Sequence, residues 1–197
     1  SGEILALVTA PSYNPNMLVG RKRSKNSTLL FNDTISKPSY DRSLLATYAP
    51  GSPFKMMNAL IGLQEGVINE DTGFKCYHGF RYGKRKNEFM GCHCSITGRP
   101  IKLKTAIAKS CNSYFSNTYK RIVEKDNNPS EGVDNWKKHI SSFGLGDYLG
   151  YDLPAGVKGL IPDGKYYDDR KKYRWNGSST ISNAIGQGEI LITPIQL

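Results

Sequence analysis

The sequence of 197 residues lacks any apolar run that approaches the ~20 residues a helix needs to cross a bilayer. It also lacks a visible signal peptide. Hydrophobic residues account for 38% of the chain, a low share for a compact domain. These absences predict no membrane-spanning helix within the sequence. A chain of this length is nevertheless one domain or a large part of one, and it is long enough to bury a core.

Acidic residues are also scarce, with 17 Asp and Glu against 27 Lys and Arg, which gives a net charge of +10. Such a balance favours an anionic partner such as nucleic acid, a lipid surface or an acidic polymer, or else a solvated basic surface. The basic run 21–25 has no aromatic residues between its charges, so we interpret it as a solvated loop. Aromatic residues do stand among basic ones at Tyr166, Tyr167, Tyr173 and Trp175. That mixture is typical of a stacking platform for single strands, but we favour packing of these rings against the body.

Residues 47–66 are the stretch around which the rest of the chain is organised, and a helix is predicted to begin there. Pro50 and Gly51 break the preceding segment. Pro53 suits a first helical turn because its missing N–H costs nothing at that position. Apolar residues then recur at steps of three and four, which indicates one buried face, and Gly66 closes the helix. The apolar residues of this face are Phe54, Met57, Leu60 and Ile61.

Ser52 and Lys55 lie three residues apart at the start of this helix, so they share a face and the Lys55 Nζ can reach the Ser52 Oγ. A serine becomes a good nucleophile only when a base takes its proton, and a lysine can be that base only when it is neutral. Burial and the positive end of a helix dipole both disfavour the charged lysine. The pair therefore predicts an activated serine, although Ser52 taken alone is also explained as a helix cap.

A second polar pair, Ser110 and Asn112, lies further along the chain. Ser-x-x-Lys followed by Ser-x-Asn is two thirds of the motif set of penicillin-binding proteins and serine β-lactamases. The surroundings resemble that family as well. The matching stretches are residues 2–16 (the opening strand), 49–55 (the nucleophile turn), 143–146 and 152–156 (the middle), and 185–197 (the Gly-Gln-Gly…Thr-Pro-x-Gln segment).

Taken together, these stretches most resemble the class B penicillin-binding proteins of the elongation type, known as penicillin-binding protein 2. The resemblance implies an α+β transpeptidase fold. The family's third motif, Lys-Thr-Gly or Lys-Ser-Gly, is absent from the sequence. We therefore expect residues 1–197 to be a partial transpeptidase domain. It would hold largely the helical part, without most strands of the central sheet, and would be nearly inactive by itself.

The resemblance also implies a role for each of the four polar residues. Ser52 attacks the penultimate D-alanine carbonyl of a stem peptide ending in D-Ala-D-Ala, and neutral Lys55 takes its proton. Ser110 relays the proton to the leaving D-alanine, and Asn112 positions Lys55 and the substrate amide. An amine of a neighbouring peptide then takes the acyl group and forms the cross-link. β-Lactams would acylate Ser52 by the same route.

Partners and location follow from the same resemblance. It implies a glycosyltransferase of the elongation complex as partner and a location on the periplasmic side of the bacterial inner membrane. Membrane attachment would come only through an anchor outside this chain. Nucleic acid and organic cofactors are not expected.

The four cysteines are Cys76, Cys92, Cys94 and Cys111, and His78 and His93 lie beside them. The residues are compatible with two disulfides, with free buried cysteines and with a structural zinc site. The adjacent pair 92 and 94 is irregular, because Cys-x-x-Cys is the usual zinc spacing. The resemblance favours zinc, since some elongation-type members hold zinc with this loop and with the cysteine inside Ser-x-Asn. It implies Cys76 and Cys111 as ligands; we add Cys92 and Cys94, with His93 or His78 as a substitute.

Other functional classes are also considered. A zinc-stabilised basic binding module would explain the charge and the cysteines, but not the four polar residues in their family context. A β-lactam sensor or hydrolase of the same fold usually lacks the Gly-Gln-Gly…Thr-Pro segment. A non-catalytic scaffold is compatible with the missing third motif.

Several elements are expected in the first half of the chain. Apolar residues 3–10 predict a buried strand, and residues 20–43 have the composition of a loop. A short helix is expected over 43–48. Residues 67–100 are predicted to be a long irregular insert that contains three of the cysteines.

The second half is expected to be more helical. Residues 101–125 have helical periodicity, and by resemblance this stretch divides near 109–111. An apolar stripe over 133–143 predicts another helix. Residues 154–180 are expected to be rich in loops, and the pair 193–194 predicts the beginning of a helix.

Overall fold

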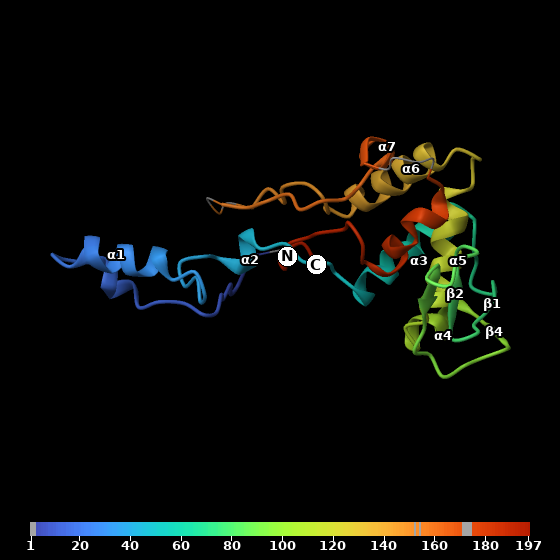
Figure 1. Ribbon diagram of the computed structural model, residues 1–197, viewed down its shortest axis with the longest axis horizontal. Coiled ribbons are helices and arrows are strands. Elements are labelled where there is room, and N and C mark those ends of the chain that lie inside the picture. The colour runs from blue at the N-terminus through green and yellow to red at the C-terminus, as the bar shows by residue number, and fades with distance from the viewer. Residues whose placement is uncertain (1–2, 152, 154, 171–174) are drawn as a thin grey trace.

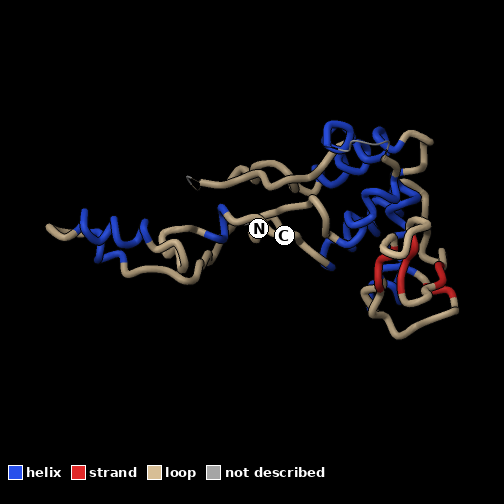
Figure 2. Tube along the Cα trace, viewed as in Figure 1, coloured by secondary structure: helices blue, strands red, loops and turns tan. Residues whose placement is uncertain are grey.

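The computed structural model describes residues 3–151, 153, 155–170 and 175–197. Helices dominate and the strands are short (Figure 1; Figure 2). The helices are η1 (Pro15–Leu18), α1 (Arg23–Asn32), α2 (Arg42–Leu45), η2 (Ser52–Phe54), α3 (Lys55–Gln64), α4 (Leu103–Ala108), α5 (Asn112–Val123), α6 (Pro129–Ser142), α7 (Gly164–Arg170) and η3 (Gly177–Ile185). The strands are β1 (Phe74–Lys75), β2 (Gly79–Arg81), β3 (Phe89–Gly91) and β4 (Pro100–Ile101). Gly2, Asp152, Pro154 and Tyr173, which were singled out in the sequence, lie outside the described residues.

The core of the body forms around α5, against which α3, α6 and η3 pack (Figure 1). Trp136 of α6 is fully buried, and its ring meets Tyr119 of α5 edge-on with centroids 5.4 Å apart. Phe54 is also fully buried and lies 6.1 Å from the Trp136 ring. Burying side chains of this size stabilises the fold by roughly 1.5–3 kcal/mol each. This core holds the first turn of α3 in a fixed place.

The helix boundaries next to the candidate site agree with the sequence prediction. The helix expected from residue 52 onwards is present as η2 and α3, and Gly66 follows it with a φ of +67°. The break expected near 109–111 lies between α4 and α5. The predicted apolar face is only partly correct, because Ile61 is buried while Leu60 is 50% exposed.

The segment before α3 forms an arm that extends away from the body and carries η1, α1 and α2 (Figure 1; Figure 2). Helix α1 corrects the loop expected over residues 20–43. No apolar stripe marked this helix, because it buries only Leu30 and packs on no large surface. Local bonds support it instead, such as the one from the Asn26 Nδ2 to the Met17 carbonyl at 2.8 Å. The basic run 21–25 is exposed, as predicted.

The strands form two small antiparallel sheets, in which β1 pairs with β4 and β2 pairs with β3. They give regular structure to the insert that was expected to be irregular. The buried strand predicted for residues 3–10 was wrong. Leu5 is 93% exposed and Val8 is 84% exposed. No described segment pairs with this stretch, and a lone strand leaves its backbone groups without partners.

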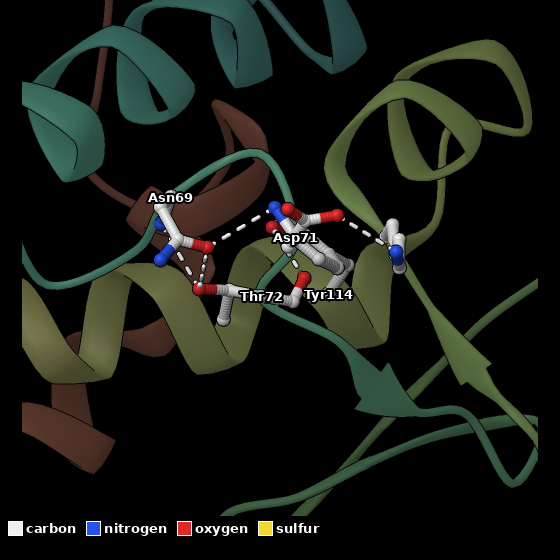
Figure 3. A network of polar contacts seen from close by, with 5 residues as sticks. Asn69, Asp71, Thr72 and Tyr114 are labelled. Atoms are coloured by element: carbon white, nitrogen blue, oxygen red, sulfur yellow. Dashed lines mark hydrogen bonds and ion pairs between the residues drawn. The ribbon is translucent and has the colours of Figure 1, made fainter.

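A polar turn connects α3 to the insert and ties it to α5 (Figure 3). The Asn69 Oδ1 accepts from the Asp71 N–H at 3.0 Å and from the Thr72 hydroxyl at 2.9 Å. The Tyr114 hydroxyl of α5 donates to the Thr72 carbonyl at 3.2 Å. Lys102 pairs with Asp71 at 2.7 Å. The two ends of the insert are thereby held close to α5.

The last third of the chain differs from the expectation in two places. Helix α7 lies within the stretch expected to be loop, and the Asp163 side chain accepts from the Tyr166 N–H at 2.7 Å near its start. Residues 193–197 form a turn rather than a helix, closed by the Gln196 N–H on the Thr193 carbonyl at 3.0 Å. Tyr167 and Trp175 are buried against each other, so the predicted packing of these rings is confirmed.

Candidate active site

The turn that presents Ser52 is shaped by two glycines from distant parts of the chain. Gly51 has φ +67° and ψ −149°, a conformation that glycine adopts without strain. Its N–H donates to the Gly186 carbonyl at 2.8 Å. A Cβ on Gly186 would lie 2.4 Å from the Gly51 carbonyl oxygen and 2.6 Å from the Phe54 Cβ. The close approach of these two backbones therefore requires glycine at residue 186.

Lys55 is the centre of the polar contacts. Its side chain is only 3% exposed. The Nζ lies 3.2 Å from the Ser52 Oγ and 2.8 Å from the Ser110 Oγ. It also lies 2.8 Å from the Ser110 carbonyl oxygen and 2.6 Å from the Asn112 Oδ1. The four residues predicted from the two motifs therefore meet in one place, although 55 residues separate Lys55 from Ser110.

Burial lowers the pKa of the Lys55 ammonium from its usual value of 10.5, because the charged form loses hydration. Negative charge on Cys92, Cys111 and Cys94 acts in the opposite direction but is the smaller influence. A larger fraction of neutral amine is thus present at a given pH than for an exposed lysine. That is the condition under which a lysine can accept a proton from a serine.

Ser110 and Asn112 are positioned by the break between α4 and α5. Ser110 has a φ of +48°, a left-handed conformation that costs a non-glycine residue about 1–2 kcal/mol. The conformation turns its hydroxyl towards Ser52, with 3.1 Å between the two Oγ atoms. Asn112 opens α5, and its Nδ2 donates to the Gly91 carbonyl at 2.8 Å. The amide oxygen of Asn112 is thereby directed at Lys55.

Two contributors to this site were missed in the sequence. The Gly91 carbonyl orients Asn112, and no sequence signal marks a backbone carbonyl for such a role. Gly186 had a signal, since it lies in the Gly-Gln-Gly stretch that the family resemblance rested on. Its contact with Gly51 could be seen only once the chain was folded.

The four cysteines also converge, in a buried cluster beside this site. All four are free and buried, and their Sγ atoms lie within 4.8 Å of one another. The Sγ of Cys94 is 3.4 Å from that of Cys76 and 3.5 Å from that of Cys111. Four thiolates at ~2.3 Å from a tetrahedral zinc would be separated by ~3.8 Å. The donor set and its spacing therefore fit such an ion. His78 and His93, considered as substitutes, are exposed and lie outside the cluster.

Comparison with protein families matches residues 1–197 to the penicillin binding protein transpeptidase domain. The chain is 34% identical over 198 residues to the peptidoglycan D,D-transpeptidase MrdA of Acinetobacter baumannii, covering 100% of this chain and 28% of that protein. Among solved structures it resembles the complex of penicillin-binding protein PBP2 with MreC from Helicobacter pylori. The TM-score is 0.82 at 29% identity, with 99% of this chain and 34% of that one covered.

A second solved structure, described as a peptidoglycan synthase complex that coordinates polymerization and crosslinking, matches with a TM-score of 0.79 at 30% identity. It covers 99% of this chain and 31% of that one. The chain thus spans about a third or less of each of these three proteins. The expected transpeptidase fold, helix-rich and with only short strands over these residues, is confirmed by the family match and the structural likeness.

Proposed function

Because the chain belongs to the penicillin-binding protein transpeptidase family, we propose that it supplies the nucleophile of a peptidoglycan D,D-transpeptidase that works through a serine acyl-enzyme. The observation that carries this proposal is the buried Lys55 amine in contact with Ser52, Ser110 and Asn112. A lysine in that environment can activate a serine, whereas a helix cap needs no such partner.

The hydrogen-bond geometry supports Lys55 as the base. The Ser110 carbonyl and the Asn112 Oδ1 can only accept hydrogen bonds, so they engage two hydrogens of the amine. A neutral amine has just two hydrogens, and its lone pair is then left for the Ser52 hydroxyl proton. Lys55 takes this proton as the Ser52 Oγ attacks the carbonyl carbon of the penultimate D-alanine.

The proton then has a route to the leaving group. The Ser110 hydroxyl lies within hydrogen-bonding distance of both Lys55 and Ser52, so it can pass the proton to the nitrogen of the terminal D-alanine. The C–N bond breaks, D-alanine departs with the proton, and the acyl group stays on Ser52. An amine of a second stem peptide attacks this ester by the reverse route and restores the Ser52 hydroxyl. A β-lactam would open its ring on Ser52 in the same way.

The Ser52 backbone N–H adds a stabilising contact. It lies at the first residue of η2, where a backbone N–H has no acceptor within the helix. It is thus suited to be one half of an oxyanion hole. The other half would come from the strand that carries the third motif. We propose that residues 1–197 are one part of a transpeptidase domain, since this motif is absent from the sequence and the chain spans 28% of the A. baumannii relative.

Labelling with a fluorescent penicillin tests the proposal in the full-length protein that contains these residues. We expect labelling at Ser52, located by mass spectrometry of the labelled peptide, and its loss in Ser52→Ala. Ser142→Ala is the matched control, because that residue is exposed and its hydroxyl bonds only to the His139 carbonyl within the part of the chain that the structure describes. The 197-residue chain alone should label far more weakly. Labelling that persists in Ser52→Ala, or that maps to another residue, would refute the proposed nucleophile.

We also propose that Cys76, Cys92, Cys94 and Cys111 hold a structural zinc ion. Zinc would supply no chemistry to the reaction, and its contribution would be to fix the insert against α5. Cys92 follows Gly91, whose carbonyl holds Asn112, and Cys111 lies between Ser110 and Asn112. A rigid cluster would therefore fix the Gly91 carbonyl, which accepts from the Asn112 side chain, and also the backbone directly before Asn112.

Partners and location are proposed from the relatives. One structural neighbour is a peptidoglycan synthase complex that coordinates polymerization and crosslinking, and another is a complex of PBP2 with MreC. We propose that the full-length protein likewise works with a glycan polymerase, at the periplasmic side of the inner membrane. Within the described residues, no helix has the length and apolar character needed to span a bilayer.

A further inference from the structure

Asn58 is a buried polar residue of α3 for which the proposed chemistry has no use. It lies three residues after Lys55 and is 0% exposed. A carboxamide buried there without hydrogen-bond partners would strongly destabilise the fold. Apart from Lys55, the other buried residues of α3 are Ala59, Ile61 and Gly62, so a buried carboxamide here calls for a specific set of partners.

Those partners belong to two other elements. The Asn58 Oδ1 accepts from the Trp136 Nε1 of α6 at 2.8 Å. The Asn58 Nδ2 donates to two successive carbonyls at the end of η3, those of Asn183 at 3.1 Å and Ala184 at 3.0 Å. All three bonds are buried, where hydrogen bonds are strong and costly to break. Asn58 thus fixes the distance between α3 and the end of η3.

The end of η3 leads directly to the nucleophile turn. Gly186 follows Ala184 by two residues, and its carbonyl accepts from the Gly51 N–H. The Gly186 backbone is packed so closely against Gly51 and Phe54 that even a Cβ would not fit. A shift of the η3 end relative to α3 must therefore move Gly51, and Ser52 is the next residue.

We propose that Asn58 is a positioning residue for the nucleophile: its Nδ2 holds the carbonyls of 183 and 184, and through Gly186 and Gly51 it sets the direction of the Ser52 hydroxyl. The inference rests on the proposed function, because it gives Ser52 the role of nucleophile. Within the described residues, no hydrogen bond joins the Asn58 side chain to the Lys55 amine. Asn58 therefore acts on the placement of Ser52 and not on the protonation of the base. A misplacement of about 1 Å can cost a reaction on the order of 100-fold in rate.

The first test compares Asn58→Leu with Thr118→Val in the full-length protein. Thr118 is a matched control, because it is also 0% exposed and, among the described residues, its hydroxyl bonds only to the Tyr114 carbonyl of its own helix. We expect Asn58→Leu to lower the maximal acylation rate by a fluorescent penicillin roughly 10–100-fold. The concentration for half-maximal rate and the pH midpoint should not change. Thr118→Val should stay within about threefold of the unsubstituted rate.

Two further measurements keep the inference testable. If Asn58→Leu does not fold, Asn58→Asp replaces it, because a carboxyl group still accepts from Trp136 but, in either protonation state, can donate to at most one of the two carbonyls. Hydrogen exchange at the Gly51 amide is independent of activity, and we expect it to become faster in either Asn58 variant and not in Thr118→Val.

Clear outcomes would overturn the inference. These are equal rate losses in the Asn58 and Thr118 variants at matched folded fraction, or unchanged Gly51 exchange in the Asn58 variants. A failure of the proposed function is distinguishable from both, because the unsubstituted protein would then not be acylated at Ser52. The Gly51 exchange result would in that case still decide whether Asn58 holds the turn.

Discussion

Lys55 has four oxygen atoms within 3.2 Å of its Nζ, yet no carboxylate is among them. Carbonyl and hydroxyl oxygens can satisfy an amine in either protonation state, whereas a carboxylate would hold it charged. Burial then favours the neutral form. The residue types around Lys55 therefore suit a base better than they suit an ion pair.

This environment predicts the pH dependence of acylation. Because burial lowers the pKa of Lys55, the acylation rate should rise with pH and reach half its plateau below 10.5, the usual value for lysine. The measurement is the second-order rate constant for a fluorescent penicillin across pH in the full-length protein. Lys55→Arg should lower the rate constant roughly 10²–10⁴-fold, since a guanidinium does not give up its proton.

The matched control is Lys125→Gln. Lys125 is exposed, and its bond to Glu65 raises its pKa. Substituting Lys125 should therefore not change the pH at which the acylation rate reaches half its plateau. A rate that survives Lys55→Arg would contradict a basic role for this amine.

At the scale of elements, the site depends on how closely η3 approaches the beginning of α3. Helix packing alone brings two helices to 8–10 Å, and side chains fill the space between them. Here a backbone-to-backbone bond joins Gly51 to Gly186, and both residues have positive φ values. The nucleophile turn is therefore held by residue 186 as much as by its own helix.

Gly186→Ala should lower acylation strongly and also reduce stability, because the added Cβ would lie 2.4 Å from the Gly51 carbonyl oxygen. Overpacking of this kind typically costs about 1–3 kcal/mol. Gly188→Ala is the comparison, since Gly188 has a similar φ of +77° but the atoms nearest to an added Cβ would be side-chain atoms of Ser182 and Asn183, the closest at 3.0 Å. Rate constants at matched folded fraction separate the two effects. Equal losses in both variants would show that backbone strain, and not contact with Gly51, is responsible.

At the scale of the whole molecule, the candidate site is built from the body, and the arm that carries η1, α1 and α2 extends away from it (Figure 1). The body gathers four stretches that are far apart in the chain: the nucleophile turn, the insert around Gly91, the 110–112 break and Gly186. The insert contacts the rest through the cysteine cluster, the Asn112 bond and the Asn69–Thr72 turn (Figure 3). It also packs apolar side chains against the body: Ile68 is buried, and Phe74, Phe80 and Met90 are partly buried against the core. We therefore expect the cluster to stabilise the insert together with these apolar contacts.

Metal removal should therefore loosen the insert and the site together. A metal at 100 times its dissociation constant stabilises a protein by about 2.7 kcal/mol, which is roughly 5–10 °C in Tm for a chain of this size. We expect one zinc per chain by elemental analysis, and a fall in Tm of this order after treatment with a chelator. Cys76→Ser should bind less zinc, whereas His93→Ala should not. Two disulfides found under non-reducing conditions in the purified protein would contradict the zinc site.

The sequence by itself determined the family and the residues of the candidate site. Ser52 with Lys55 and Ser110 with Asn112 are local motifs, and each is short enough to be read from neighbouring residues. The boundaries of α3 were also predictable, because glycine, proline and apolar periodicity act over one or two turns. The break between α4 and α5 was predicted only from the family resemblance, since periodicity alone indicated one helical stretch. Helix α1 and the exposed residues 3–10 were not, since one is supported by scattered local bonds and the other depends on a strand partner.

Only the tertiary structure decided how these motifs meet. The bonds from Gly51 to Gly186, from Asn112 to Gly91 and from Asn58 to residues 183 and 184 join segments separated by 21 to more than 100 residues. In each of these hydrogen bonds the acceptor is a backbone carbonyl, a group that every residue type has. Such contacts leave no trace in the order of side chains, and they exist only when packing has brought the backbones together.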